Sequence, residues 1–197
     1  MDDGDAVPVG QLIAVAKTGD RLALGRLLEA VLGRVRAFVR LNLGAALRAH
    51  EEDQDLVQST CREAIEHFGQ FQGDSEGELI AWLITTARNK LRMRHRFWQR
   101  ERRAGGAAPL SAMEDAGLMR AYASVITPGR LVAGAEAAAR IEAALDGLSP
   151  EHREVISLAR ILGLPHAEIA TIMGRSEAAV RQLLVRALRA LTLALDR

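Results

Sequence analysis

The stretch from His166 to Leu183, HAEIATIMGRSEAAVRQL, gives the clearest indication of the fold of the C-terminal part of this chain. Ala170 is small enough for a second helix to cross closely, and Gly174 tolerates the positive φ angle of a sharp turn. Val180 offers an aliphatic side chain that can pack back onto the first helix. This spacing predicts a helix-turn-helix motif. The small core between its helices is predicted to contain Ile169, Met173 and Leu183.

The second helix of this motif presents a polar outer face. The residues expected on this face or at the start of the helix are Arg175, Ser176, Glu177, Arg181, Gln182 and Arg186. In the major groove of DNA, Arg pairs with guanine and Gln with adenine. The N–H groups at a helix N-terminus favour a phosphate. The pattern therefore predicts a DNA-reading helix. The alternative is an ordinary helical hairpin with solvated arginines.

Short helices are predicted around this motif. One covers about residues 135–147, and Ser149 is the expected N-cap of the next, with Pro150 at its first position. Gly163 ends that helix, and Pro165 opens a brief one. Ser176 then caps a final helix that runs to about residue 195.

Apolar residues at helical spacing also predict helices in the N-terminal half. These cover residues 10–17, a stretch capped by Asp20 that runs to about Asn42, residues 53–68, and residues 78–102. The segment Phe71-Gln72-Gly73-Asp74-Ser75 breaks the pattern, being polar and glycine-containing. No segment shows the alternation of a strand, so the fold class is all-α.

A change in composition divides the chain. Residues 104–134 open with Ala104-Gly105-Gly106-Ala107-Ala108-Pro109 and lack clear periodicity, although 113–126 could form a transient helix. We therefore expect two small helical domains, 1–103 and 135–197, joined by a flexible linker at 104–134. The sequence leaves open whether the two domains close on each other.

The predicted fourth helix ends in a strongly basic tract, RNKLRMRHRFWQRERR, from Arg88 to Arg103. Glu101 is its one acid, and Phe97 and Trp98 are interleaved with the cations. Cations follow a nucleic-acid backbone, while aromatic rings stack on unpaired bases. Nucleic-acid binding is favoured over a merely solvated helix end or a membrane surface.

The stretch from Glu51 to Gln58, EEDQDLVQ, concentrates acids at a predicted helix start. Acids there stabilise the helix dipole, which is one sufficient reason for their presence. No histidine or further acid recurs at a metal-ligand spacing nearby. If these acids serve a function, they suit a basic protein surface.

Composition excludes several classes of protein. The net charge is +1 and the hydrophobic fraction is 49%, which fits a packed protein with separate acidic and basic faces. The single cysteine, Cys61, rules out an internal disulfide. No apolar run suggests a membrane span or a signal peptide, so we expect a cytoplasmic protein without membrane insertion. No catalytic set, metal cluster or cofactor motif stands out, so we expect neither an enzyme nor a bound cofactor.

The order of several segments resembles the sigma-70 family, specifically its small extracytoplasmic-function group, which keeps only the second and fourth conserved regions. The resemblance covers about residues 10–103 and 137–195. It is carried by the helix-turn-helix and by Asp55-Leu56-Val57-Gln58, Phe71-Gln72-Gly73-Asp74-Ser75, Ala81-Trp82-Leu83, Ala87-Arg88-Asn89 and Leu145-Asp146-Gly147-Leu148-Ser149-Pro150-Glu151-His152-Arg153.

This resemblance implies a transcription initiation factor that binds core RNA polymerase and recognises promoter −10 and −35 elements. The β′ clamp helices of the polymerase would be bound by Asp53, Asp55, Leu56 and Gln58. The −10 element would be bound by Phe71, Gln72, Gly73, Asp74, Ser75, Arg88, Asn89, Arg92 and Arg96. The −35 element would be bound by Arg175, Ser176, Glu177, Arg181, Gln182 and Arg186, in a domain that also contacts the β flap.

The resemblance also allows an anti-sigma factor as a partner. Two alternatives remain open. The chain could be a helix-turn-helix regulator that acts without polymerase, or a sigma-like adaptor that does not melt promoters.

Overall fold

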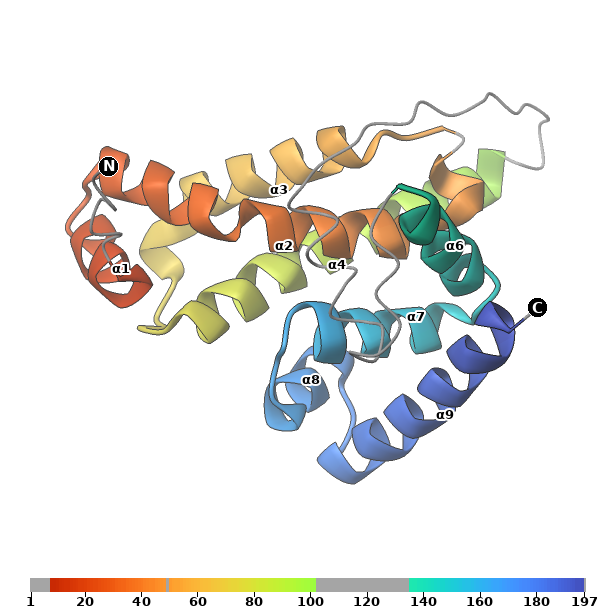
Figure 1. Cartoon of the computed structure of the whole chain (residues 1–197). Coiled ribbons are helices and arrows are strands. Elements are labelled where there is room, and N and C mark those ends of the chain that lie inside the picture. Colours follow the sequence, from red (N-terminus) through yellow and green to blue (C-terminus); the bar gives the residue numbers. More distant parts are fainter. Residues whose placement is uncertain (1–7, 49, 102–134, 197) are drawn as a thin grey trace, which may run out of the picture.

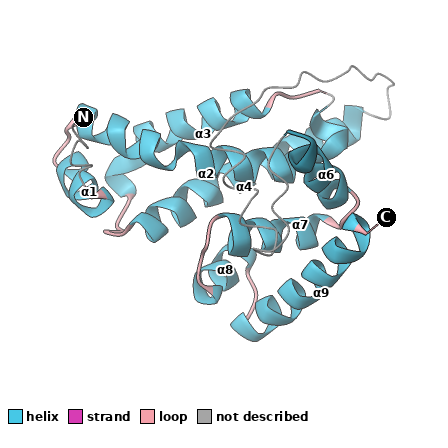
Figure 2. Cartoon of the chain, in the orientation of Figure 1, coloured by secondary structure: helices cyan, strands magenta, loops and turns pink. Residues whose placement is uncertain are grey.

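Helices joined by loops make up residues 8–48, 50–101 and 135–196, which are the part of the chain that the computed structural model describes. No strand occurs among these residues, which confirms the predicted all-α class (Figure 2). The predicted linker at 104–134, including the possible helix at 113–126, lies outside the described residues.

The N-terminal unit, residues 8–101, is built around one long central helix. Its elements are α1 (Val9–Lys17), α2 (Arg21–Arg48), α3 (Asp53–His67), the 3-10 turn η1 (Phe68–Gln70) and α4 (Glu76–Glu101). α2 packs against α3 and α4, and α1 packs against the start of α2 (Figure 1). Buried residues recur along α2 at helical spacing, among them Leu27, Val31, Val35 and Phe38. This pattern orients one face of α2 into the core.

Asp20 begins α2 as predicted. Its Oδ1 accepts hydrogen bonds from the N–H groups of Leu22, at 2.8 Å, and Ala23, at 3.0 Å. These are two of the N–H groups that lack a partner at a helix start, so the cap stabilises the helix.

The C-terminal unit, residues 135–196, contains the predicted helix-turn-helix. Its elements are α6 (Ala135–Asp146), α7 (Pro150–Ile156), the π-helical turn η3 (Ser157–Ile161), α8 (His166–Met173) and α9 (Glu177–Leu195). Ser149 and Ser176 cap α7 and α9, since their hydroxyls accept from the N–H groups three residues later at 3.3 and 3.2 Å. Gly174 ends α8 with φ 66°. Both predicted caps and the predicted turn are therefore confirmed.

α2 is interrupted close to the predicted end near Asn42. At Gly44 φ is 70° and ψ is 155°, which is not helical, and a second helical segment follows within α2 up to Arg48. Such backbone angles are essentially confined to glycine. Leu43 and Leu47 are buried, so the apolar face continues past the break. The sequence therefore predicted the break but not the short helical segment after it.

The two units pack against each other. In Figure 1, α7 lies below α2 and α4, and α6 lies beside the C-terminal part of α2. Arg40 Nε is 2.6 Å from Glu142 Oε1, and Arg48 forms an ion pair with Asp146. A Cβ added at Gly44 would lie 2.5 Å from an Arg153 nitrogen of α7. The question of domain closure, open from the sequence, is thus answered for this structure, in which the units are closed.

Candidate nucleic-acid and protein interfaces

The loop between η1 and α4 is held by a capping box. The Glu78 carboxylate accepts from the backbone N–H groups of Asp74, at 2.9 Å, and Ser75, at 3.1 Å, and from the Ser75 hydroxyl at 2.8 Å. The Ser75 hydroxyl in turn accepts from the Glu78 N–H at 3.3 Å. These bonds, those to the Asp74 backbone foremost, lower the pKa of Glu78. The loop therefore has a defined shape before any ligand binds.

The predicted loop residues differ in their exposure. Gln72, Asp74 and Ser75 are exposed, and Gly73 is half-buried. Phe71 is only 5% exposed, because its ring packs 5.5 Å from that of Trp82 and 5.7 Å from that of Phe68. In this structure the Phe71 ring is thus buried in the core and anchors the loop. The exposed side chains of Gln72, Asp74 and Ser75 can contact a ligand.

α4 presents most of the predicted basic face to solvent. Asn89, Arg92 and Arg96 are exposed. Among the aromatics, Phe97 is 51% exposed. Trp98 instead stacks on His50 with ring centroids 4.2 Å apart, and its Nε1 donates to Glu51 at 3.0 Å. Of the two rings predicted to meet bases, Phe97 is therefore the available one here.

Arg88 is the exception on this helix. Its side chain is 13% exposed, and its guanidinium donates to the Glu154 carboxylate of α7 and to the Ile172 carbonyl of α8. Both partners belong to the C-terminal unit. The guanidinium of Arg88, which the sequence predicts to bind DNA, is thus bound to the C-terminal unit of the same chain.

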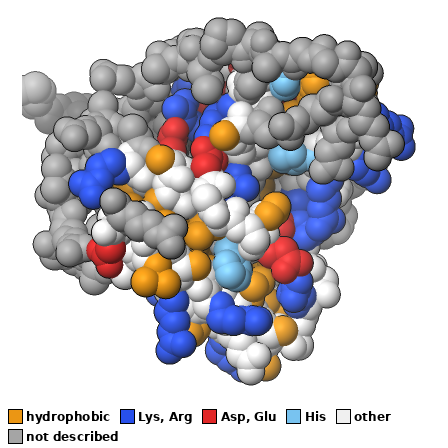
Figure 3. All heavy atoms as spheres, turned by 90° about the vertical axis from the view of Figure 1, so that its right-hand side faces the viewer, with side chains coloured by type: hydrophobic (Ala, Val, Ile, Leu, Met, Phe, Trp, Pro, Cys, Tyr) orange, Lys and Arg blue, Asp and Glu red, His pale blue; other side chains and the backbone are white. Residues whose placement is uncertain are grey.

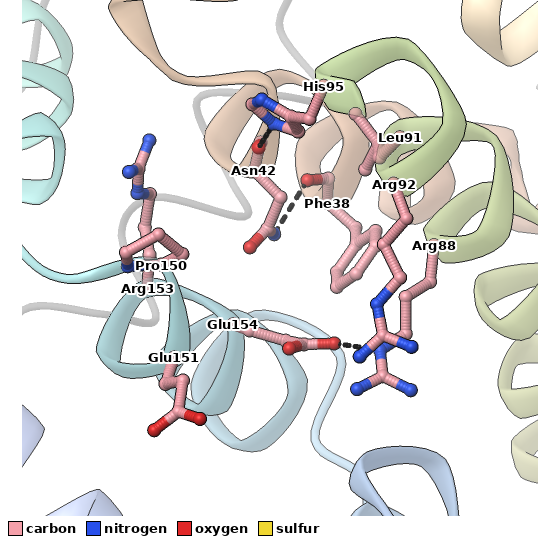
Figure 4. Close-up of a pocket in the computed structure, with 10 residues that line it drawn as sticks. All are labelled: Phe38, Asn42, Arg88, Leu91, Arg92, His95, Pro150, Glu151, Arg153 and Glu154. Atoms are coloured by element: carbon pink, nitrogen blue, oxygen red, sulfur yellow. Dashed lines mark hydrogen bonds and ion pairs between the residues drawn. The ribbon is translucent and has the colours of Figure 1, made fainter. Parts of the chain in front are cut away.

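A cavity of about 200 Å³ lies at this boundary. Residues of α2, α4 and α7 line it (Figure 4). Arg88 and Glu154 point toward each other across it, while Asn42 and His95 lie at another side. The His95 Nε2 is 3.4 Å from the Asn42 carbonyl oxygen. His95 is half-buried and lines the cavity between the units.

Glu168 of α8 lies against the first turn of α4. A Cβ added at Gly77 would lie 3.6 Å from Glu168 Oε1. Glu168 Oε2 is buried and has no hydrogen-bond partner among the described residues. Desolvation, with a smaller contribution from the charge of Glu78, raises the pKa of Glu168. Its ionised form is therefore disfavoured by the closed arrangement.

The residues predicted to bind polymerase occupy the start of α3. Asp55 and Gln58 are exposed. Asp53 is less so, and its Oδ2 lies 3.3 Å from Arg36 Nε. Leu56 is 3% exposed and belongs to the core of the N-terminal unit. The structure thus brings three polar members of the predicted set to one end of α3 and turns Leu56 inward.

α9 places its predicted residues as the motif requires. Val180 and Leu183 are buried, and Glu177, Arg181, Gln182 and Arg186 are exposed. Arg175 forms an ion pair with Glu151 at 2.6 Å, and Arg181 one with Glu177 at 3.4 Å. On the face shown in Figure 3, Lys and Arg side chains gather at the lower end, over the C-terminal unit. Exposed ion pairs of this kind are weak, so a phosphate or a base can displace them.

Sequence reasoning missed three residues: Lys17, Glu154 and Glu168. Lys17 donates to the Gln72 carbonyl, and Glu154 accepts from Arg88. Glu168 lies beside Gly77. Each of the three lies against a segment far along the chain, so no local pattern marks it. Cys61 is half-buried, and this burial raises the pKa of its thiol.

None of the helices in the described ranges is long and apolar enough to cross a membrane. Within the same ranges, no three His, Cys, Asp or Glu side chains are grouped so that they could hold a metal ion.

Comparison with known proteins gives matches to both units. The model of sigma-70 region 2 matches residues 26–102, and that of sigma-70 region 4 matches residues 138–191. The chain is 32% identical to the RNA polymerase sigma factor NccH of Alcaligenes xylosoxydans xylosoxydans, over 90% of this chain and 89% of NccH. It is 28% identical to the ECF RNA polymerase sigma factor BldN of Streptomyces coelicolor, over 96% of this chain and 66% of BldN.

A solved structure agrees with these matches. The sigma factor RpoE from Bartonella quintana, in complex with the anti-sigma factor NepR, superposes with a TM-score of 0.64 at 25% identity. The superposition covers 87% of this chain and 96% of that one.

Proposed function

The chain belongs to the extracytoplasmic-function group of the sigma-70 family and directs RNA polymerase to promoters, and from this premise we propose how its residues divide that work. Residues 1–103 form the domain that binds polymerase and the −10 element. Residues 135–197 form the domain that reads the −35 element, and 104–134 link the two. The chain acts by binding rather than by catalysis and needs no cofactor.

The observation that carries this division is the placement of opposite charges on different helices. Asp55 and Gln58 are exposed at the start of α3, with Asp53 beside them, whereas Arg92 and Arg96 are exposed on α4. An acidic surface suits the polymerase β′ clamp helices, and a basic one suits the DNA backbone. We assign polymerase binding to the first group, with Leu56 supporting it from the core.

The −10 element is assigned to the loop and to the exposed part of α4. The capping box leaves the side chains of Gln72 and Asp74 exposed at one edge of the loop. A preshaped loop suits an unpaired base, because less conformational entropy is lost when the base binds. Phe71 and Gly73 shape this loop, and Ser75 caps the helix that follows. Asn89 lies near Arg92 on the same helix and joins it in facing the DNA.

The −35 element is assigned to α9 and the turn before it. Arg181, Gln182 and Arg186 are exposed on the outer face of the second helix of the motif, the face that enters the major groove in helix-turn-helix proteins. Glu177 accompanies them, and Arg175 and Ser176 at the helix start are assigned to a phosphate. The same domain contacts the β flap of the polymerase.

The closed structure represents a state that must open for promoter binding. Arg88 cannot face DNA while it donates to Glu154 and Ile172. A protein partner could hold this closed state. The RpoE structure contains an anti-sigma factor, and we propose that a partner of that kind controls this chain as well. Polymerase and promoters place its action in the bacterial cytoplasm.

The test is binding of the full chain to bacterial core RNA polymerase. The triple variant Asp53→Ala, Asp55→Ala, Gln58→Ala should lose binding, because it removes the polar surface of α3. Glu66→Ala is the matched control, since Glu66 is an exposed acid further along the same helix. Equal binding by all three proteins would contradict the assigned surface. DNA binding without any polymerase binding, even after the closed state is opened, would favour an independent DNA-binding regulator.

A further inference from the structure

α1 lies against the loop that we assign to the −10 element, although the two are far apart in the chain. Lys17, at the end of α1, donates from Nζ to the Gln72 carbonyl at 3.3 Å. The same ammonium lies 5.6 Å from the centroid of the Phe71 ring. Near the other end of α1, a Cβ added at Gly10 would lie 3.8 Å from the Asp74 carbonyl. α1 therefore approaches the loop at two points along its length.

α1 is fixed firmly enough to serve as a support. Ile13 and Ala16 are 1% and 4% exposed and belong to the core of the N-terminal unit. Burial of this face holds the helix against α2, so that Lys17 projects from a rigid element. The Lys17 side chain itself is exposed, so replacing it leaves the core intact.

Lys17 acts on a part of the loop that the capping box does not hold. Glu78 binds the backbone at Asp74 and Ser75. Lys17 binds the carbonyl at Gln72, directly beside the buried Phe71 ring. With the backbone held at Gln72 by Lys17 and at Asp74 and Ser75 by Glu78, the exposed Gln72 side chain extends from a fixed backbone position. Both contacts of Lys17 need a cation, because a charged donor strengthens the hydrogen bond and the ring face attracts positive charge.

We infer that Lys17 is a positioning residue for −10 recognition, and that α1, which lies outside the residues 26–102 matched by the region 2 model, belongs to the promoter-reading apparatus. This inference rests on the assignment of the loop to the −10 element. Lys17 acts on base preference through the loop and does not itself bind the DNA backbone.

The test compares Lys17→Met with Lys17→Arg in holoenzyme assembled from the full chain and core RNA polymerase. Met keeps the length of the stem and removes the charge, whereas Arg keeps both contacts. Arg26→Met is the control, because Arg26 is an exposed cation on α2. The probe is fork-junction DNA with a randomised single-stranded −10 segment, and the measured quantity is the enrichment of the preferred over the disfavoured base at each position.

Loss of one charged hydrogen bond should reduce this preference by about three- to tenfold at the position that the loop reads. Lys17→Arg and Arg26→Met should retain it, and all variants should bind core polymerase equally. A direct phosphate contact would instead weaken binding to every sequence equally and lower the salt slope by about one, and that result would overturn the inference. If the wild-type protein binds core polymerase but shows no base preference in this segment, the loop assignment itself fails, and the inference with it.

Discussion

Glu154→Gln should open the two units, because it weakens the contact that hides Arg88. The Arg88 and Glu154 side chains are 13% and 15% exposed, so solvent screens their interaction little. A hydrogen bond between a charged pair stabilises by about 1.5–3 kcal/mol, and a neutral amide acceptor by about 0.5–1.5 kcal/mol. The expected loss is therefore about 1–1.5 kcal/mol, which lowers the closed-to-open ratio about five- to tenfold.

Energy transfer between two dyes measures this ratio directly. Cysteines introduced for labelling at Glu66 on α3 and Thr192 on α9 are both at exposed positions, one in each unit. A Cys61→Ala background removes the one native thiol. The free protein carrying Glu154→Gln should show a larger open population and should bind promoter DNA more tightly than the parent.

The matched control is Glu151→Gln on the same helix. Glu151 pairs with Arg175 inside the C-terminal unit, and its side chain is 59% exposed. Glu151 lines the cavity between the units but forms its ion pair within its own unit. This variant therefore removes the same charge without breaking an ion pair between the units, so its open population should equal that of the parent. If Glu154→Gln and Glu151→Gln behaved alike, the Arg88 contact would not contribute to closure, and the other ion pairs between the units, Arg40–Glu142 and Arg48–Asp146, would be sufficient.

The same structure predicts the effect of three other changes. Glu168→Gln should increase the closed population above pH 4.5, the ordinary pKa of this side chain, because burial in the closed state raises that pKa and disfavours the carboxylate. Below pH 4.5 the variant and the parent should close equally, and the difference between them should grow as pH rises through the raised pKa. Equal energy transfer in the two proteins above this range would refute the assignment. Gly44→Ala should lower the free energy of unfolding by about 1–3 kcal/mol, measured by urea denaturation, whereas Gly33→Ala, with open space around its Cβ position, should not destabilise. Ser176→Ala should cost about 0.5–2 kcal/mol in the same assay through loss of the α9 cap, and Ser176→Asp, which keeps an acceptor, should cost much less.

Local patterns were sufficient for the helices and their ends. The caps at Asp20, Ser149 and Ser176 and the turn at Gly174 depend on residues within three or four positions of each other. The alternation of buried and exposed positions on α9 follows from the helical repeat alone. The predicted helix end near Asn42 lies two residues before the non-helical Gly44, but the helical segment from there to Arg48 was not predicted.

The sequence predicted the candidate site residues correctly where their side chains are exposed to solvent. Asp55, Gln58, Arg92 and Arg186 are exposed, as residues that bind a partner must be. Leu56 lies in a motif that sequence reasoning assigned to a partner, yet it is buried, because a helix must also bury one face of its own. Phe71 is buried for the same reason: its ring packs against that of Trp82 in the core instead of facing a partner.

The helices, the helix-turn-helix and the family could therefore be predicted from the order of residues. The contacts of Arg88 with Glu154, of Lys17 with the loop and of Glu168 with α4 depend on how the helices pack in three dimensions. The first two of these contacts join residues 66 and 55 positions apart in the chain. Helical periodicity and helix caps depend on residues that are close together in the chain, so they can be predicted from the sequence. A pairing across the molecule depends on how whole helices pack, and a single sequence does not state that.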